Sequence, residues 1–147
     1  MGFLGPDQYD AELDFDIGKR YGVLGLGTAG VIVMDEDTDV VAMTRNIVRF
    51  FARESCGQCT PCREGSAWAL KILNRIMAGG GTTRDLDLLD ELAGSMGAMP
   101  GTTICGLADG TNWAVSTALK KFRPDFEARV TRAAVAVGAG AGNSAMG

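Results

Sequence analysis

Apolar residues recur at intervals of three and four through most of the chain after residue 38, which is the pattern of amphipathic helices. One such run predicts a helix over about residues 39–55, and another predicts a helix over about residues 63–77. Gly79-Gly-Gly81 follows the second run and is expected to end that helix. The residues expected to face inward are Met43, Ile47, Phe50 and Phe51 in the first helix and Trp68, Ile72 and Ile76 in the second.

Two more helices and a short final one are predicted farther along the chain. The third begins at Thr82 or Thr83, where Asp85 in the first turn is typical of a capping box. The fourth begins near Asp109 as its N-cap, and Pro124 either ends it or opens a last helix over residues 125–132. The inward residues are expected to be Leu86, Leu89 and Leu92 in the third helix and Trp113, Leu119 and Phe122 in the fourth, whereas Asp85, Asp87, Asp90 and Glu91 are expected to form a solvated face.

The first 38 residues lack this helical pattern. The β-branched run that starts at Val31 predicts a short buried strand. Just before it, Gly25, Gly27 and Gly30 match the dinucleotide-binding fingerprint, but that fingerprint needs a strand before it and a helix after it. A glycine turn is therefore favoured over a phosphate site. The expected organisation is an irregular N-terminal segment with a short strand (1–38), a helical region (39–132) and a mobile Ala/Gly tail (133–147).

Charge and hydropathy exclude several classes of function. The formal net charge of −4 argues against a nucleic-acid partner, because binding to phosphates needs a basic face. No segment approaches the roughly 20 apolar residues that span a bilayer, and no basic stretch followed by an apolar one opens the chain. We therefore expect a cytoplasmic protein without a transmembrane segment, in a reducing compartment where cysteines stay thiols or bind metal.

The candidate chemistry is concentrated in four cysteines, because histidine is absent and His-based catalysis and ligation are thereby excluded. Cys56, Cys59 and Cys62 are each separated by two residues, and Cys105 lies on a later loop just before the fourth predicted helix. Three thiolates at this spacing can bind one side of an iron–sulfur cluster while a remote cysteine completes the site. The pattern favours one [4Fe–4S] cluster. The N-termini of the second and fourth helices would then face the cluster and stabilise its reduced state.

Three other uses of the cysteines are weighed against this one. A four-cysteine zinc site usually has two separated C-x2-C pairs, and a redox dithiol would need only two cysteines. Structural disulfides are rare in a reducing compartment. The cubane cluster is favoured because it accounts for all four residues. The charged residues that flank the loop are expected to form salt bridges between helices; they are Arg53, Glu54, Arg63 and Glu64.

The sequence around the cysteines resembles a known family. ESCGQCTPCREG and the later TTICGLADG are similar to the C-terminal iron–sulfur domain of the NADH- and flavin-binding subunit of respiratory complex I. The same domain occurs in the diaphorase subunits of NAD-reducing hydrogenases and NAD-dependent formate dehydrogenases. The likeness continues through LDFD, LGTAGVIVMDED and KFRPDFE and covers roughly residues 2–128.

The resemblance implies a mainly α fold, in which a four-helix bundle over residues 39–132 carries the cluster-binding loop and follows a short glycine-rich β segment. It implies that Cys56, Cys59, Cys62 and Cys105 bind a [4Fe–4S] cluster, which takes single electrons from reduced flavin mononucleotide and passes them to further clusters. Members of the family carry an NADH- and flavin-binding domain and a ubiquitin-like domain ahead of this region, and this sequence contains neither. We therefore expect that the chain alone binds no flavin or NAD and is not catalytic alone.

These expectations lead to one leading hypothesis and one alternative. The leading hypothesis is an electron-transfer subunit that relays single electrons within an NAD-linked or other multi-subunit oxidoreductase. Its expected partners are a flavoprotein, other iron–sulfur proteins, or both. The alternative is a structural or assembly subunit, in which the cluster or a zinc ion only stabilises the bundle.

Overall fold

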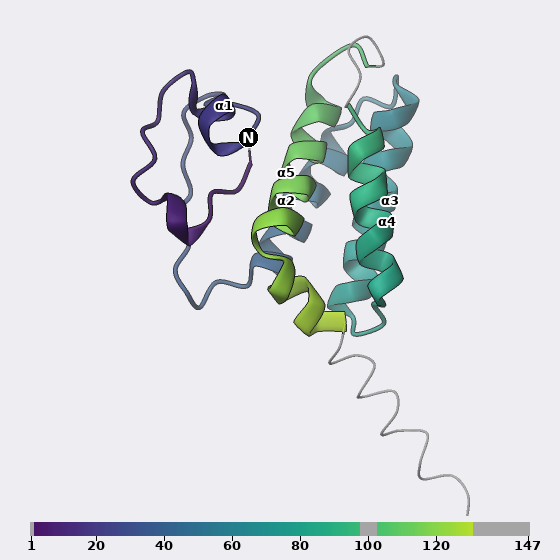
Figure 1. The fold of residues 1–147 in the computed structure, drawn as a ribbon. Coiled ribbons are helices and arrows are strands. Elements are labelled where there is room, and N and C mark those ends of the chain that lie inside the picture. Colours follow the sequence, from purple (N-terminus) through teal and green to yellow (C-terminus); the bar gives the residue numbers. More distant parts are fainter. Residues whose placement is uncertain (1, 98–102, 131–147) are drawn as a thin grey trace, which may run out of the picture.

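The computed structural model describes residues 2–97 and 103–130 (Figure 1). Its elements in chain order are η1 (Pro6–Gln8), α1 (Ile17–Tyr21), α2 (Val40–Glu54), α3 (Thr60–Met77), α4 (Thr83–Ser95) and α5 (Leu107–Lys121). Residues 123–130 form a further helical stretch with Pro124 in its first turn, where the missing amide hydrogen costs little. The fold is mainly α, as predicted, and the predicted mobile tail over 133–147 lies outside the described residues.

The starts of the helices agree with the predicted starts in two cases and differ in two. Asp39 caps α2 by accepting a hydrogen bond from the amide of Ala42 at 3.0 Å, and Thr82 forms a capping box with Asp85 at the start of α4. The second predicted helix begins earlier than expected, because Thr60 and the following proline already occupy the first turn of α3. The fourth also begins earlier, at Leu107, so that Asp109 lies inside the first turn and is not the N-cap.

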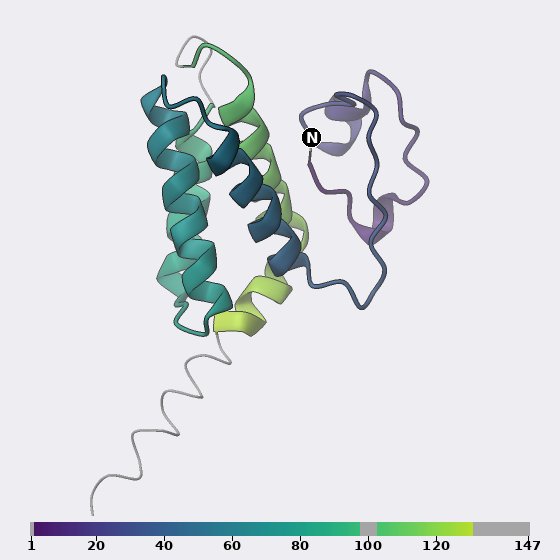
Figure 2. The same ribbon diagram turned by 180° about the vertical axis from the view of Figure 1, so that it is seen from behind.

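Four long helices pack side by side around one apolar core (Figures 1 and 2). Successive helices run in opposite directions, so the α2–α3 connection and the approach to α5 lie at the same end of the molecule (Figure 1). The core receives buried residues from every one of these helices, and they include Val48 of α2, Leu73 and Ile76 of α3, Leu86 and Leu89 of α4, and Val115 and Leu119 of α5. No helix in the described ranges is long and apolar enough to cross a bilayer.

Two aromatic residues predicted for the core lie on the surface instead. Trp68 of α3 is 57% exposed and Phe50 of α2 is 55% exposed. Each stands next to a buried position, Ala69 in α3 and Phe51 in α2. The apolar stripe of each helix is therefore narrower than the prediction, which counted every large apolar side chain as inward.

Asp85 is buried, whereas the sequence predicted that it would lie on a solvated face. Its carboxylate accepts hydrogen bonds from the amide of Thr82 at 2.8 Å and from the hydroxyl of Thr82 at 3.0 Å, and it forms an ion pair with Arg75 of α3. Burial alone raises the pKa of Asp85. The hydrogen bonds from Arg75 and Thr82 outweigh burial, so the pKa lies below its usual value.

The strand predicted from Val31 is not formed in the structure. Residues 30–35 have no regular secondary structure, and the side chain of Val33 is 86% exposed. A lone β segment is not stable in water, because its backbone groups need a neighbouring strand. The described residues contain no neighbouring strand, so the β-branched run does not form one.

The N-terminal segment is nevertheless attached to the helices, along α5 (Figure 1). The Phe3 side chain joins the helical core and packs edge-on against Phe122, with ring centroids 6.1 Å apart. Lys121 donates hydrogen bonds to the Phe3 carbonyl at 2.7 Å, to Oε1 of Gln8 at 2.7 Å and to the Tyr21 carbonyl at 3.0 Å. A single ammonium group thus joins three separate positions of the segment to the end of α5.

We expect Asp85→Asn to lower the free energy of unfolding by about 1–2 kcal/mol at pH 7, because it loses the charged cap and the ion pair with Arg75. Asp90→Asn, an exposed change on the same helix, should have almost no effect. Because the folded pKa of Asp85 is depressed, its contribution is complete above about pH 4 and is lost as the pH falls through the folded pKa. Urea unfolding of variant and parent at each pH measures the difference, and a difference that stays constant as the pH falls from 7 to 2 would contradict the assignment.

We expect Lys121→Met to release the N-terminal segment from α5. Burial lowers the pKa of Lys121, while Asp7 acts in the opposite direction, so the group sits in a partly desolvated site. Removing it takes the ammonium donor from the Phe3 and Tyr21 carbonyls, while Oε1 of Gln8 keeps the amide of Gly5, and should cost roughly 1–3 kcal/mol. Tryptic cleavage after Lys19 and Arg20 should become faster. The exposed neighbour Lys120→Met is the control, and equal cleavage rates in both variants would refute the clamp.

Candidate metal centre

Three of the four cysteines lie on the α2–α3 connection and the first turn of α3. Cys56 is exposed, Cys59 is the N-cap residue of α3, and Cys62 is buried in the first turn. Because Cys59 makes no side-chain cap, the first amides of α3 have no side-chain acceptor from that residue. Pro61 has no amide hydrogen and the Arg63 amide donates to the Cys59 carbonyl, so the amides of Thr60 and Cys62 are the donors at this helix start for an anionic group held by the loop.

Ser55 and Arg63 hold this loop in shape. The Ser55 hydroxyl oxygen accepts hydrogen bonds from the amide of Gly57 and from the thiol of Cys62, both at 3.3 Å. The Arg63 guanidinium donates to the carbonyl of Gly57 at 2.7 Å, which closes the loop from the other side. Gly57 has a φ of +80°, a backbone conformation that a residue with a side chain rarely adopts. The turn that separates Cys56 from Cys59 therefore depends on glycine.

The charged residues beside the loop do not link two helices. Arg63 forms its ion pair with its sequence neighbour Glu64, at 3.0 Å on the same helix. The salt bridges predicted between α2 and α3 are not among the ion pairs of the described residues. The guanidinium of Arg63 already binds the Gly57 carbonyl in the loop and the carboxylate of Glu64, so it does not form an ion pair with α2.

The fourth cysteine lies on the segment that leads into α5, and this segment contacts the cysteine loop. The amide of Ile104 donates a hydrogen bond to Sγ of Cys59 at 3.4 Å, so the segment carrying Cys105 touches the cysteine loop directly. Cys105 itself is exposed. Gly106 is the N-cap of α5 and makes no side-chain cap, so α5 also presents uncapped amides next to a cysteine.

Two close helix contacts bring these segments together. A Cβ atom at Gly110, in the first turn of α5, would lie 2.8 Å from the ring of Phe51, near the end of α2. A Cβ atom at Gly65 of α3 would overlap Sδ of Met96, at the end of α4. Both Phe51 and Met96 are buried. The absence of a side chain at these two glycines therefore allows α5 to approach α2 and the end of α4 to approach α3 at the end of the molecule that carries the cysteines.

The residues present fit an iron–sulfur cluster. All four cysteines are free of disulfide bonds, and thiolates are the usual ligands of iron–sulfur clusters. Two helix N-termini lie beside the cysteine segments, and the Ser55 hydroxyl, which accepts a hydrogen bond from the Cys62 thiol, can donate to that sulfur once the thiol has lost its proton. Donors in these positions favour an anionic cluster. Within residues 2–97 and 103–130, no three Cys, Asp or Glu side chains are gathered as ligands for a single metal ion.

The sequence pattern locates the cysteines but not the residues that position them. Ser55 has no signal of its own, because a serine beside a cysteine is common and its two hydrogen bonds depend on the loop conformation. Gly65 and Gly110 lie inside helices, where the sequence pattern shows only a weak helix former. An unexplained glycine in a helix of otherwise good helix formers is the one signal that points to a close approach.

A family model described as the NADH-ubiquinone oxidoreductase-F iron-sulfur binding region matches residues 42–129. An NADH-quinone oxidoreductase subunit of Rhizobium meliloti (strain 1021) is 41% identical over 138 residues, which cover 92% of this chain and 31% of that protein. The mitochondrial NADH-ubiquinone oxidoreductase 51 kDa subunit of Neurospora crassa is 44% identical over 120 residues, covering 82% of this chain and 24% of that protein. This chain therefore spans less than a third of the length of these relatives.

A solved structure is similar as well. The crystal structure of an NAD+-reducing [NiFe]-hydrogenase in the H2-reduced state matches with a TM-score of 0.60 and 37% identity. The match covers 67% of this chain and 16% of that chain.

We expect Gly110→Ala to weaken the metal centre by pushing α5 away from Phe51. Overpacking of this kind costs about 1–3 kcal/mol, and it acts here on the helix that follows Cys105. The variant should unfold at lower urea and contain less iron per chain after anaerobic purification. Gly94→Ala is the control. It also replaces a glycine inside a helix, but its Cβ would meet no atom within 4 Å. Equal iron content in the two variants would contradict the role given to Gly110.

Proposed function

Since this chain belongs to the family of NADH-ubiquinone oxidoreductase-F iron-sulfur binding regions, we propose that it relays single electrons through one [4Fe–4S] cluster within a multi-subunit oxidoreductase. The cofactor is a [4Fe–4S] cluster, as expected from the cysteine spacing. When bound, such a cluster accepts and releases one electron at a time. The contact between Ile104 and Cys59 is the single observation that carries the proposal for this chain, because it joins the remote cysteine segment to the cysteine loop.

The proposed ligands are the thiolates of Cys56, Cys59, Cys62 and Cys105. Three come from a loop whose ends are fixed by α2 and α3, and the fourth precedes α5. The proposed scaffold is the four-helix bundle over 39–132, which supplies both loops from one end. A site built between helix ends keeps its ligands in place in both oxidation states, which favours fast electron transfer over rearrangement.

The surroundings of the thiols favour the reduced, more negative state. The uncapped amides at the starts of α3 and α5 carry partial positive charge, and the Ser55 hydroxyl can donate to the Cys62 thiolate once its proton is lost. Each of these donors stabilises added negative charge at the cysteines. They therefore raise the reduction potential relative to the same ligands in an apolar pocket.

We further propose that the electron donor and acceptor are separate proteins. The relatives are named as subunits of NADH-quinone and NADH-ubiquinone oxidoreductases, and this chain spans less than a third of their length. A flavoprotein is the proposed donor and another iron–sulfur protein the proposed acceptor. We propose in addition that the chain is not catalytic alone and that it works in the cytoplasm.

We expect Cys105→Ser to lose or convert the cluster. Protein purified without oxygen should contain about four irons and four sulfides per chain and give a paramagnetic signal after reduction. The variant should fall below four irons and lose that signal. Ile104→Ser is the matched control, because it places the same side chain one residue away and keeps the backbone amide that donates to Cys59.

Two outcomes would contradict the proposal. Zinc in place of iron would remove electron transfer altogether, and a full cluster in Cys105→Ser would show that the remote ligand is assigned wrongly. A different measurement distinguishes electron transfer from the alternative in which the cluster only stabilises the fold. In the intact enzyme, a cluster that the enzyme's own substrate does not reduce would serve stability alone.

A further inference from the structure

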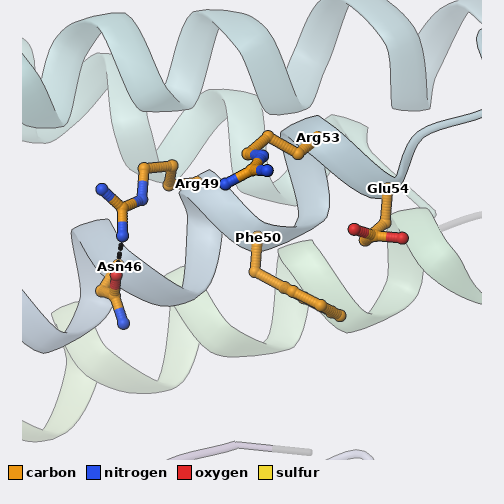
Figure 3. Close-up of a pocket in the computed structure, with 5 residues that line it drawn as sticks. All are labelled: Asn46, Arg49, Phe50, Arg53 and Glu54. Carbon is orange, nitrogen blue, oxygen red and sulfur yellow. Dashed lines mark hydrogen bonds between the residues drawn. The ribbon is translucent and has the colours of Figure 1, made fainter.

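The outer face of α2 carries a row of arginines. Arg45, Arg49 and Arg53 follow one another at intervals of four, so they lie along one side of the helix. Together with Phe50 they form a surface that we name the arginine face, of which Figure 3 shows Arg49, Phe50 and Arg53. α2 contains these three arginines and one acid, Glu54, whereas the whole chain has a net charge of −4. Positive charge is thus gathered on one helix of an acidic protein.

These arginines have no carboxylate partner among the described residues. Arg49 donates to the side chain of Asn46 at 2.7 Å, and Arg45 donates to Asn74 of α3 at 2.7 Å. Neither Arg49 nor Arg53 forms an ion pair with any acid in the part of the chain that the structure describes. Other arginines do pair with acids, as the ion pairs of Arg20, Arg63, Arg75, Arg123 and Arg129 demonstrate.

Phe50 gives this charged surface a fixed apolar centre. Its ring is 55% exposed, yet it packs edge-on against the buried ring of Phe51, with centroids 5.6 Å apart and planes at 70°. Phe51 in turn packs over Gly110 of α5. An exposed aromatic ring held by a buried one, with arginines on both sides, has the composition of a binding hot spot.

The shape of this surface fits a protein better than a small molecule. Asn46, Arg49, Phe50, Arg53 and Glu54 surround a hollow of about 270 Å³ (Figure 3). This volume is below the roughly 300–1,000 Å³ typical of small-molecule sites, which also enclose most of their ligand. All five residues come from one helix, so nothing closes over the hollow. Arginine and aromatic residues on an open surface are typical of protein interfaces.

We propose that the arginine face is the docking surface for an acidic patch of a redox partner protein, and that electrons pass between that partner and the cluster bound by this chain. The proposal rests on the proposed function. α2 ends at Glu54, and Cys56 follows two residues later, so a protein seated on the end of α2 lies beside the cysteine loop. Carboxylates on the partner would supply the ion-pair partners that Arg49 and Arg53 lack within the described residues.

Charge at this position acts mainly on the rate of encounter. Exposed charges steer an oppositely charged protein to the correct side of the molecule, and the effect decreases with salt. The remainder of this chain is acidic and would repel the same partner. The arginine face therefore selects the orientation in which the partner meets the cluster end.

The test uses cluster-loaded protein and measures how fast its oxidised cluster is reduced by an acidic plant-type [2Fe–2S] ferredoxin of lower potential. In Arg49→Glu/Arg53→Glu the bimolecular rate at low salt should fall about tenfold or more, and the difference should disappear at high salt. The milder Arg49→Gln/Arg53→Gln should be slowed less. Arg84→Glu/Lys120→Glu is the matched control, because it changes the charge equally at the opposite end of the helices and should have little effect.

Iron content and reduction by the small cation methyl viologen separate this proposal from the proposed function. A cluster that methyl viologen does not reduce would end the electron-transfer proposal itself. A cluster that methyl viologen reduces, with ferredoxin rates equal in all variants, would overturn only the docking proposal. So would a rate lowered equally by Arg84→Glu/Lys120→Glu. The last measurement is the oligomeric state by sedimentation. A dimer that Arg49→Glu/Arg53→Glu dissociates would overturn the docking proposal, because a second copy of the chain would then cover this face.

Discussion

The close approach of helix ends at Gly65 and Gly110 is the constraint on which the rest of the structure depends. At each position the helix backbone lies against a buried side chain of another helix, Met96 in one case and Phe51 in the other. A methyl group at either glycine would occupy space that the neighbour already fills. These contacts set how near α5 comes to α2 and how near α4 comes to α3. They therefore set the distance between the cysteine loop and the segment that carries Cys105.

The other structural features lie on different parts of the molecule from the cysteine end. The N-terminal segment lies along α5 and is held there by the ammonium group of Lys121 and by Phe3. The outer face of α2 stays uncovered by the described residues, and its arginines are free to meet charge from outside the chain. The ion pair between buried Asp85 and half-exposed Arg75 joins α3 to α4 at the far end. The cysteine end and the outer face of α2 are thus parts of a set of helices whose stabilising ion pair and N-terminal contacts lie at other places in the molecule.

Local pattern was enough to predict the long helices, because helical periodicity is a short-range property of the chain. It also selected the four cysteines as proposed ligands on their spacing alone. The family inferred from the cysteine motif is confirmed by the match over residues 42–129. What pattern could not predict depends on partners distant in sequence. Asp85 is buried only because Arg75 and Thr82 satisfy its carboxylate, and the run from Val31 forms no strand because no described strand lies beside it. Both outcomes are decided by tertiary neighbours, which a single sequence does not display.

The wrong predictions for Phe50 and Trp68 have a physical cause of their own. A large apolar side chain on a helix meets the same requirement, removal from water, whether it packs in a core or against another protein. A pattern of apolar residues therefore cannot separate the two uses. On α2 the structure does separate them, because Phe51 faces the core while Phe50 stands outside it between arginines. Two features together identify an outward binding face. One is an exposed apolar residue beside the buried stripe of the helix, and the other is a group of charges of one sign without ion-pair partners near it.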